Sequence, residues 1–366
     1  MRRCTSADAP YDEEDVPRVA ERLDVSGRVL VQAPDGLKGI AREVADVLEG
    51  RGCEVVLDAG RVFGACDVTL GLVEGVDCLV HIGHYPIPSV ERRLRELGVR
   101  TFFLPTRGRK GVEEWMVEEA AEVLRSLGVD RVDLCATGQH VHELGRVAEV
   151  LEREGIRARV GRGDSERVPV PGLVLGCNFS CLGGRPVVIV CSGRFHPLGA
   201  RLRTGRPVVQ IDPVRGVVDP ESLEEEVRRV LAVRLSKVRE FDPGEGVEVV
   251  GSTCLGQRRE DVLEALGGPR WEVRYLSEDV LRAVRCEQCV YCGCPRVPVD
   301  ESARFRRWVV LNPAEAALAL GGGGEYRLDE IPTDPSVLRA LRGLRDGRGG
   351  SAADGVPGAG PGPAAR

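Results

Sequence analysis

The sequence lacks the features that would place it in a membrane or on a nucleic acid. None of its apolar runs approaches the ~20 residues that a bilayer-spanning helix needs. Its first residues contain no apolar stretch of the kind found in signal peptides. The formal net charge of −6 also lacks the basic excess typical of a dedicated nucleic-acid binder. We therefore expect a cytoplasmic protein with neither a membrane nor a nucleic-acid partner.

Lysine is also scarce, since the chain contains only Lys38, Lys110 and Lys237. Hydrophobic residues nevertheless make up 42% of the chain and charged residues 30%, which is typical of a folded globular protein. With 366 residues the chain is too long for one ordinary hydrophobic core, so we expect two or three domains.

Short apolar runs alternate with amphipathic stretches, a pattern typical of parallel strands joined by crossover helices. The expected strands are Arg28–Ala33, Glu54–Asp58, Cys78–Ile82, Thr101–Leu104, Arg131–Ala136, Arg157–Val160, Val187–Cys191, Val208–Asp212, Val247–Ser252, Trp271–Tyr275, Ala283–Arg285 and Trp308–Leu311. Expected helices include Gly39–Leu48, Val112–Leu127, His142–Glu154 and Ser222–Arg239.

Each third of the chain opens alike, with a strand that runs into a polar turn carrying Gln32, Gln139 or Gln257. A period of roughly 110 residues favours domain triplication over a solenoid. We therefore predict an α/β protein of three similar parallel-sheet, Rossmann-like domains around a pseudo-threefold axis. The expected ranges are 1–110 with an acidic N-terminal extension, 111–220, 221–342, and a disordered Gly/Ala/Pro tail at 343–366.

The chain contains thirteen cysteines, which a reducing compartment would not use as structural disulfides. Four of them lie in or beside apolar runs and are expected to be small core residues: Cys53, Cys78, Cys135 and Cys191.

Three other cysteines lie at similar distances from the repeated glutamines. Cys66 follows Gln32 by 34 positions, Cys177 follows Gln139 by 38, and Cys294 follows Gln257 by 37. Each lies in a turn beside glycine or proline, and around a pseudo-threefold axis the three thiols could meet. Chance is a rival explanation, because thirteen cysteines offer many coincidences. The turn contexts favour ligation of a metal.

Ligation by thiolates alone at three widely separated positions suits a 4Fe-4S cluster with one open iron better than structural zinc. An open iron could bind S-adenosylmethionine, whose sulfonium a reduced cluster can cleave. The usual radical motif C-x3-C-x2-C is absent, because position 184, three residues after Cys181, is glycine.

A second group of cysteines precedes Cys294. Cys286, Cys289 and Cys292 form with it a C-x2-C-x2-C-x-C block that starts like a ferredoxin motif but ends too early. Interpreted as loop thiols, these three could hold zinc or an auxiliary cluster, or exchange with Cys294 as ligands.

Polar residues at the expected carboxyl ends of the strands could bind S-adenosylmethionine, because ligands of open α/β sheets bind there. They are Gln32, Asp35, Gln139, His140 and Gln257. Turn-stabilising hydrogen bonds are the alternative for each. Arg296 could hold the substrate carboxylate, or it could form a structural ion pair. For His81 and His84 a structural or substrate-positioning role is expected.

Five segments together resemble a known family. They are Gln32-Ala33-Pro34-Asp35-Gly36-Leu37, Phe63-Gly64-Ala65-Cys66-Asp67, His81-Ile82-Gly83-His84, Leu175-Gly176-Cys177-Asn178 and Cys294-Pro295-Arg296-Val297. The chain is similar, from about residue 29 to 329, to the archaeal 2-(3-amino-3-carboxypropyl)histidine synthase family of diphthamide biosynthesis. Cysteines 286, 289 and 292 depart from the family pattern.

The resemblance implies that Cys66, Cys177 and Cys294 hold one 4Fe-4S cluster between three α/β domains of a homodimer. It further implies that an electron donor reduces the cluster and that the Cγ–S bond of S-adenosylmethionine breaks. The resulting 3-amino-3-carboxypropyl radical would add to C2 of a histidine in translation elongation factor 2. Two other readings stay open: a non-catalytic electron-transfer subunit, and a quinolinate-synthase-like 4Fe-4S dehydratase.

Overall fold

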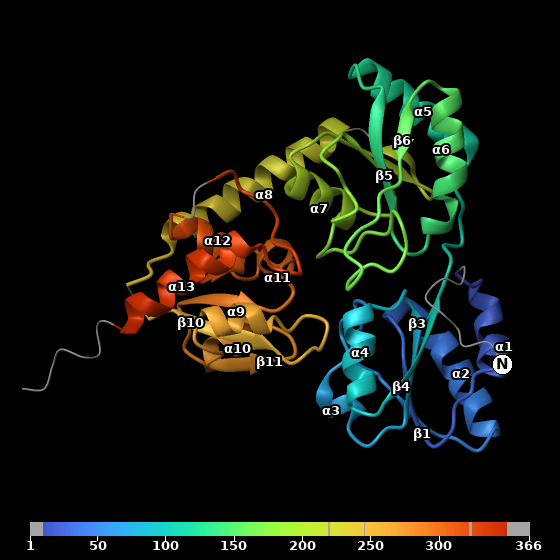
Figure 1. The fold of residues 1–366 in the computed structure, drawn as a ribbon, viewed down its shortest axis with the longest axis horizontal. Coiled ribbons are helices and arrows are strands. Elements are labelled where there is room, and N and C mark those ends of the chain that lie inside the picture. The colour runs from blue at the N-terminus through green and yellow to red at the C-terminus, as the bar shows by residue number, and fades with distance from the viewer. Residues whose placement is uncertain (1–9, 219, 245, 322–323, 350–366) are drawn as a thin grey trace, which may run out of the picture.

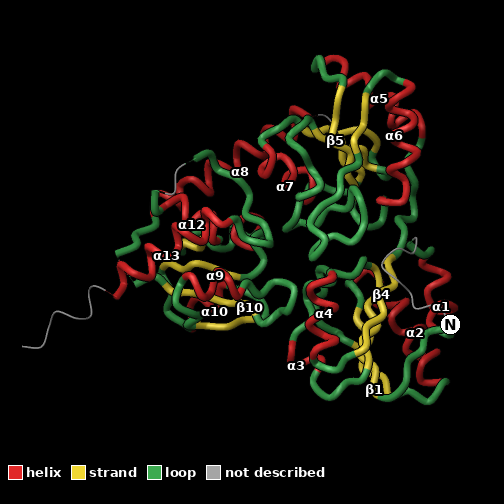
Figure 2. The backbone as a smooth tube through the Cα atoms, viewed as in Figure 1, coloured by secondary structure: helices red, strands yellow, loops and turns green. Residues whose placement is uncertain are grey.

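The computed structural model describes residues 10–218, 220–244, 246–321 and 324–349. It contains three separate β-sheets with helices packed around them, and these form three lobes at the corners of a triangle (Figures 1 and 2). Every strand pair is parallel except the last pair of the second sheet. The predicted α/β class with three parallel sheets is confirmed.

The first sheet has the order β2-β1-β3-β4. Its strands are β1 (Arg28–Gln32), β2 (Glu54–Leu57), β3 (Cys78–Gly83) and β4 (Arg100–Pro105). Its helices are α1 (Val16–Ala20), α2 (Lys38–Gly50), α3 (Leu70–Val73) and α4 (Pro88–Glu96). All of β3 is buried, as expected for a central parallel strand covered on both faces.

The second sheet has the order β6-β5-β7-β8-β9, and β9 is antiparallel to β8. Its strands are β5 (Arg131–Ala136), β6 (Arg157–Arg159), β7 (Val187–Val190), β8 (Val208–Asp212) and β9 (Gly216–Val218). Its helices are α5 (Glu114–Ser126), α6 (Leu144–Arg153) and α7 (Phe195–Thr204). The left-handed Gly205 ends α7, a conformation that glycine adopts without a steric cost.

The third sheet has the order β11-β10-β12-β13. Its strands are β10 (Glu248–Ser252), β11 (Trp271–Val273), β12 (Gln288–Cys292) and β13 (Val309–Leu311). Its helices are α9 (Glu260–Ala265), α10 (Glu278–Ala283), α11 (Val297–Asp300), α12 (Pro313–Ala319) and α13 (Pro335–Gly349). The order second-first-third-fourth thus recurs in all three sheets, which is consistent with triplication.

The long helix α8 (Pro220–Glu240) runs from the second lobe to the third (Figure 1). Its Arg234 is buried and binds Glu315 of α12, with Nη2 donating to Oε2 at 2.7 Å. The same nitrogen donates to the carbonyl oxygen of Val310, also at 2.7 Å. These contacts attach α8 to the third sheet.

Two sequence predictions for the third lobe were wrong. The expected strand at 283–285 is instead the end of α10 and the following turn, and the true strand is β12. The sequence Gln-Cys-Val-Tyr-Cys of β12 favours a ligand loop only if its cysteines are metal ligands, and in the structure they are buried apolar side chains.

The sequence predicts a disordered tail from residue 343, but helix α13 continues to Gly349 and its Leu344 is buried. Residues 350–366 lie outside the described part of the chain.

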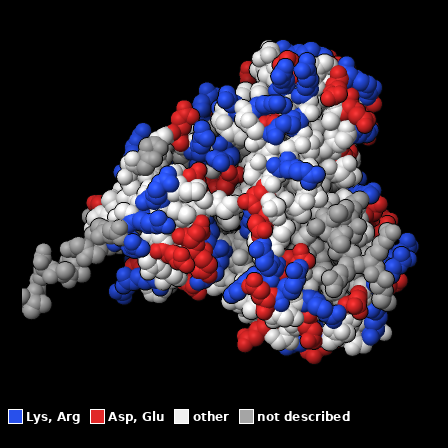
Figure 3. Space-filling model, in the orientation of Figure 1, with Lys and Arg blue, Asp and Glu red and all other residues white. Residues whose placement is uncertain are grey.

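The surface carries both charge signs. Positive and negative side chains are interspersed over all three lobes on the face in Figure 3. In the described part of the chain, each helix is too short or too polar to cross a bilayer.

Candidate metal centre

The three predicted ligands lie on loops, one in each lobe. Cys66 follows β2, Cys177 lies between β6 and β7, and Cys294 follows β12. The first two loops therefore come after the second strand of their repeats, whereas Cys294 comes after the third. In the first lobe the residue that follows the third strand, β3, is His84. The similar sequence spacings therefore belong to loops that are not equivalent in the three sheets.

The thiols are close enough to repel one another when ionised. Burial raises the pKa of Cys66 well above its usual value, and the charges of Asp67, Cys177 and Cys294 raise it further. Burial also raises the pKa of Cys294 to about 12, with Cys177 contributing. Three such thiolates are stable together only beside compensating positive charge, which a bound metal supplies. The chemistry of the donor set therefore fits a metal centre.

The three candidate ligands are all cysteines. All three cysteines are partly buried residues. Among the described residues, no three cysteine, histidine or acidic side chains converge tightly enough to hold a single metal ion. An all-thiolate donor set is typical of iron–sulfur clusters.

Each sulfur accepts a hydrogen bond from nitrogen. Arg167 donates Nη2–H to Cys177 Sγ at 3.4 Å, and Gln257 donates Nε2–H to Cys66 Sγ at 3.6 Å. The backbone N–H of Arg296 donates to the Cys294 thiol. Such N–H donors stabilise negative charge on cluster sulfurs and tune the cluster's reduction potential.

Backbone contacts join the first and third lobes at this point. Gly256 donates its N–H to the carbonyl oxygen of Cys66 at 3.1 Å, and Leu255 donates to Val68 at 2.7 Å. A Cβ on Gly256 would lie 2.5 Å from Cys66 Cα, so only glycine fits. Asp67, which is fully buried, also accepts a hydrogen bond from Gln257.

The segment before α13 holds the Cys177 loop. The N–H of Ile331 donates to the carbonyl oxygen of Cys177 at 2.9 Å, and Asn178 Nδ2 donates to the carbonyl oxygen of Ile331 at 2.9 Å. The Cys66 and Cys177 loops are therefore held by contacts from another part of the chain, rather than by their own repeat alone.

The structure brings Gln257 and Arg296 to the cysteines, but the other expected contact residues have different neighbours. Gln32 is buried and bonds both Asp58 and His81 at 2.9 Å. His140 is buried beside Glu143, with 3.3 Å between Nδ1 and Oε1. Asp35 and Gln139 are exposed at turns. A role for these four in binding S-adenosylmethionine stays a prediction.

Arg296 is almost fully buried and forms the structural ion pair that was the alternative interpretation. Its Nε and Nη2 donate to Asp300 at 2.9 and 2.8 Å. Its guanidinium stacks 4.0 Å above the Phe195 ring, and a Cβ on Gly199 would lie 2.3 Å from Nη1. Within the described residues Nη1 has no hydrogen-bond partner, so it is the one nitrogen left for a ligand.

Three buried or partly buried histidines lie together near the cysteines, and one of them, His196, was not among the residues that the sequence indicated. His81 Nε2 is 3.0 Å from His84 Nδ1, and burial lowers the pKa of His84 to about 4. Burial, Arg296 and His84 lower the pKa of His196 to about 3. These rings are neutral at pH 7. No local signal marked His196, because its neighbours come from other lobes.

Cys286, Cys289 and Cys292 are all buried; Cys289 and Cys292 lie on β12, and Cys286 lies in the loop that precedes it. Cys289 and Cys292 lie on β12 three positions apart, so they point to opposite faces of the sheet. Cys289 packs beside Cys286 on one face, and Cys292 packs in the core of the other. Cys292 is thus separated by the sheet from the other two, and an auxiliary metal site at these cysteines stays a prediction.

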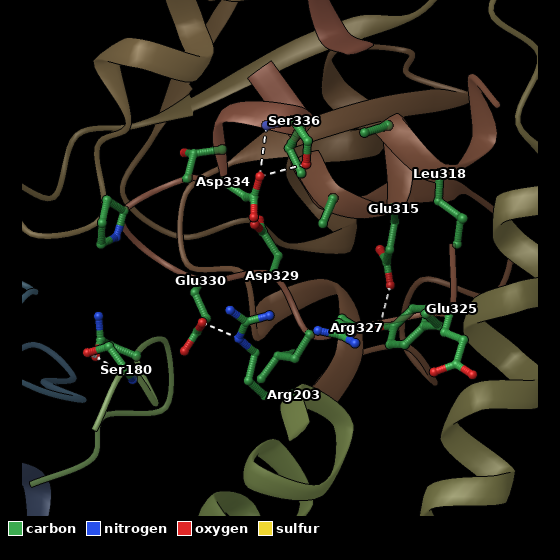
Figure 4. Close-up of a pocket in the computed structure, with 18 of the residues that line it drawn as sticks. Ser180, Arg203, Glu315, Leu318, Glu325, Arg327, Asp329, Glu330, Asp334 and Ser336 are labelled. Atoms are coloured by element: carbon green, nitrogen blue, oxygen red, sulfur yellow. Dashed lines mark hydrogen bonds and ion pairs between the residues drawn. The ribbon is translucent and has the colours of Figure 1, made fainter. Parts of the chain in front are cut away.

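A polar cavity of about 410 Å³ lies between the second and third lobes (Figure 4). Asn178 and Ser180, beside Cys177, line one wall, and the segment Glu325–Glu330 lines another. Arg203 and Glu330 form an ion pair across it. None of the three cysteines lines this cavity.

Known proteins are similar to this chain in sequence and fold. The family model described as "Putative diphthamide synthesis protein" matches residues 33–331. The chain is 34% identical over 324 residues to 2-(3-amino-3-carboxypropyl)histidine synthase from Pyrococcus horikoshii, covering 84% of this chain and 90% of that protein. It is 25% identical over 346 residues to the synthase of the same name from Methanocaldococcus jannaschii, covering 88% and 93%.

The solved structures agree. The crystal structure of Dph2 from Pyrococcus horikoshii with a 4Fe-4S cluster matches with a TM-score of 0.73 and 31% identity, over 90% of this chain and 96% of that one. A second crystal structure of the same protein matches with a TM-score of 0.72. The resemblance in the five motifs is thus confirmed, and this chain belongs to the diphthamide synthesis protein family.

Proposed function

We propose that this protein is an enzyme that transfers the 3-amino-3-carboxypropyl group of S-adenosylmethionine to C2 of a histidine in translation elongation factor 2. This is the first step of diphthamide biosynthesis. The observation that carries the proposal is the meeting of Cys66, Cys177 and Cys294 from three lobes, each with an N–H donor to its sulfur. The named synthases to which the chain is similar support the reaction.

Cys66, Cys177 and Cys294 would hold a 4Fe-4S cluster, the group with which the Pyrococcus horikoshii relative has been solved. When bound and reduced, the cluster supplies the one electron that breaks the Cγ–S bond, leaving methylthioadenosine and a 3-amino-3-carboxypropyl radical. Three protein thiolates leave a fourth iron position open for the substrate.

This chain's own residues would orient the substrate so that Cγ, rather than the adenosyl carbon, is the carbon released. Arg296 Nη1 is the unpartnered donor beside Cys294 and would bind the substrate carboxylate. Gln257 lies against Cys66 and would contact the same ligand. The enzyme would act in the cytoplasm as a homodimer and would need a low-potential electron donor.

The decisive experiment uses the full chain, purified without oxygen and reduced with dithionite. After addition of S-adenosylmethionine and elongation factor 2, we expect methylthioadenosine and a modified factor. Formation of 5′-deoxyadenosine, or no cleavage by a protein loaded with its cluster, would contradict the proposal. A loaded but inactive protein would favour the electron-transfer alternative, and turnover of a hydroxylated substrate without S-adenosylmethionine would favour the dehydratase.

A further inference from the structure

Arg167 is buried beside the cysteines, with 5% of its surface exposed. It lies on the loop that leads from β6 toward Cys177. Its Nη2 donates to Cys177 Sγ at 3.4 Å, and its Nη1 donates to the carbonyl oxygen of Gly256 at 3.0 Å. Its Nε has no hydrogen-bond partner within the described part of the chain.

Arg167 differs from the other deeply buried arginines in what balances its charge. Each of the other three has a carboxylate partner: Arg234 pairs with Glu315, Arg259 with Asp329, and Arg296 with Asp300. For Arg167, no carboxylate lies within ion-pair distance among the residues that the structure describes. The group that its guanidinium does contact is the sulfur of Cys177.

A buried guanidinium without a counter-charge is strongly unfavourable, because it has lost its hydration. Arg167 is therefore stable where it lies only if negative charge collects beside it. The ionised cysteine ligands and the cluster that they hold would supply that charge.

Arg167 also connects two of the ligand loops. Gly256, whose carbonyl oxygen Arg167 binds, donates its own N–H to the carbonyl oxygen of Cys66 at 3.1 Å. The guanidinium is thus one hydrogen bond from Cys177 and two from the backbone of Cys66. Moving it would disturb both ligands.

We propose that Arg167 is the positioning residue and built-in counter-charge of the metal centre, and that it raises the reduction potential of the bound cluster. The inference rests on the function proposed above. A positive charge close to the cluster in a water-poor site favours addition of an electron. An N–H donor to a ligand sulfur acts in the same direction.

The test compares Arg167→Met, Arg167→Gln and Arg167→Lys in the full chain, reconstituted with iron and sulfide without oxygen. Iron and sulfide contents show how much cluster each variant holds. An EPR-monitored redox titration without S-adenosylmethionine then gives each midpoint potential. Arg162→Met is the matched control, because Arg162 is an exposed arginine of the same loop.

We expect the midpoint potential of Arg167→Met and Arg167→Gln to fall by at least about 59 mV, which is a tenfold change in a one-electron equilibrium constant. Arg167→Lys keeps the charge and should recover most of that difference, while Arg162→Met should match wild type. The glutamine variant keeps an N–H donor and a long polar side chain, so it reports the charge even if the methionine variant holds little cluster.

A fully loaded Arg167→Gln with the wild-type potential would overturn the inference, as would a lysine variant shifted as far as the glutamine one. A wild-type chain that takes up no cluster would instead contradict the proposed function, so the two failures are distinguishable.

Discussion

Gly256 packs its backbone directly on Cys66. The Gly256 N–H donates to the carbonyl oxygen of Cys66 at 3.1 Å, and a Cβ on Gly256 would lie 2.5 Å from Cys66 Cα and 2.7 Å from its Cβ. Because the neighbours are main-chain atoms and the first side-chain carbon, they cannot rotate away. The third lobe thus fixes the position of Cys66, a proposed ligand in the first lobe.

We predict that Gly256→Ala displaces the Cys66 loop. Overpacking of this kind costs about 1–3 kcal/mol, and here the strain falls on a ligand, so iron content should drop with stability. The checks are iron content after reconstitution and the midpoint of urea unfolding. Gly39→Ala is the control, because a Cβ at Gly39 meets nothing within 4 Å and alanine favours helix α2. Normal cluster content in Gly256→Ala would show that the loops are not interlocked.

The cysteines should fall into two functional groups. Replacing Cys66, Cys177 or Cys294 with alanine should abolish activity and reduce retained iron, because each would supply one ligand of the proposed cluster. Cys289→Ala should leave iron content unchanged while lowering the unfolding free energy by about 1 kcal/mol, since its fully buried side chain fills a core. Iron loss in Cys289→Ala would indicate an auxiliary site after all.

Much of the fold could be predicted, because apolar runs at the right spacing specify buried parallel strands. Strand β12 is the exception. Its sequence is a short apolar run like those of the other strands, but the ligand interpretation of Cys289 and Cys292 hid that pattern. The convergence of Cys66, Cys177 and Cys294 could also be anticipated, but for an incomplete reason. Their similar spacings belong to loops that are not equivalent in the sheets, since Cys294 follows the third strand of its lobe whereas Cys66 and Cys177 follow the second.

The surroundings of the cysteines could not be predicted. The surroundings of Arg167 and His196 are made by residues from distant parts of the chain. Their local sequences look like those of ordinary surface residues. The sequence predicts that Gln257 contacts the substrate, and in the structure its amide donates to Cys66 and Asp67 of another lobe. Tertiary contacts of this kind have no local sequence signature.

The pair Arg259–Asp329 should be critical for stability. Both side chains are almost fully buried, and Arg259 also donates to Thr333 Oγ1 at 2.8 Å. Asp329→Asn would leave the guanidinium without its counter-charge, at a cost of about 3–5 kcal/mol. Thermal and urea unfolding measure the loss. Arg42→Gln is the control, because it breaks an exposed pair with Asp46 and should change neither midpoint. Equal midpoints for both variants would contradict the role assigned to burial.

Acid should destabilise the protein through its central histidines. The folded-state pKa is lowered by burial to about 4 at His84 and about 3 at His196, below the value of about 6.5 in an unfolded chain. The unfolded state therefore binds more protons below pH 6.5. Their contribution to stability is complete above that pH and is lost as the pH falls toward 4. Both side chains are partly exposed, so we expect about 1–2 kcal/mol from each between pH 7 and pH 5.

Urea unfolding of the apo-protein at pH 7 and pH 5 measures this loss without interference from a cluster. His196→Gln removes one titrating group, so its stability should fall less between the two pH values than that of wild type. Arg42→Gln, which adds or removes no group that titrates in this range, should show the full wild-type loss. If His196→Gln and wild type lost the same free energy, His196 would not be held neutral by the surroundings of the metal centre.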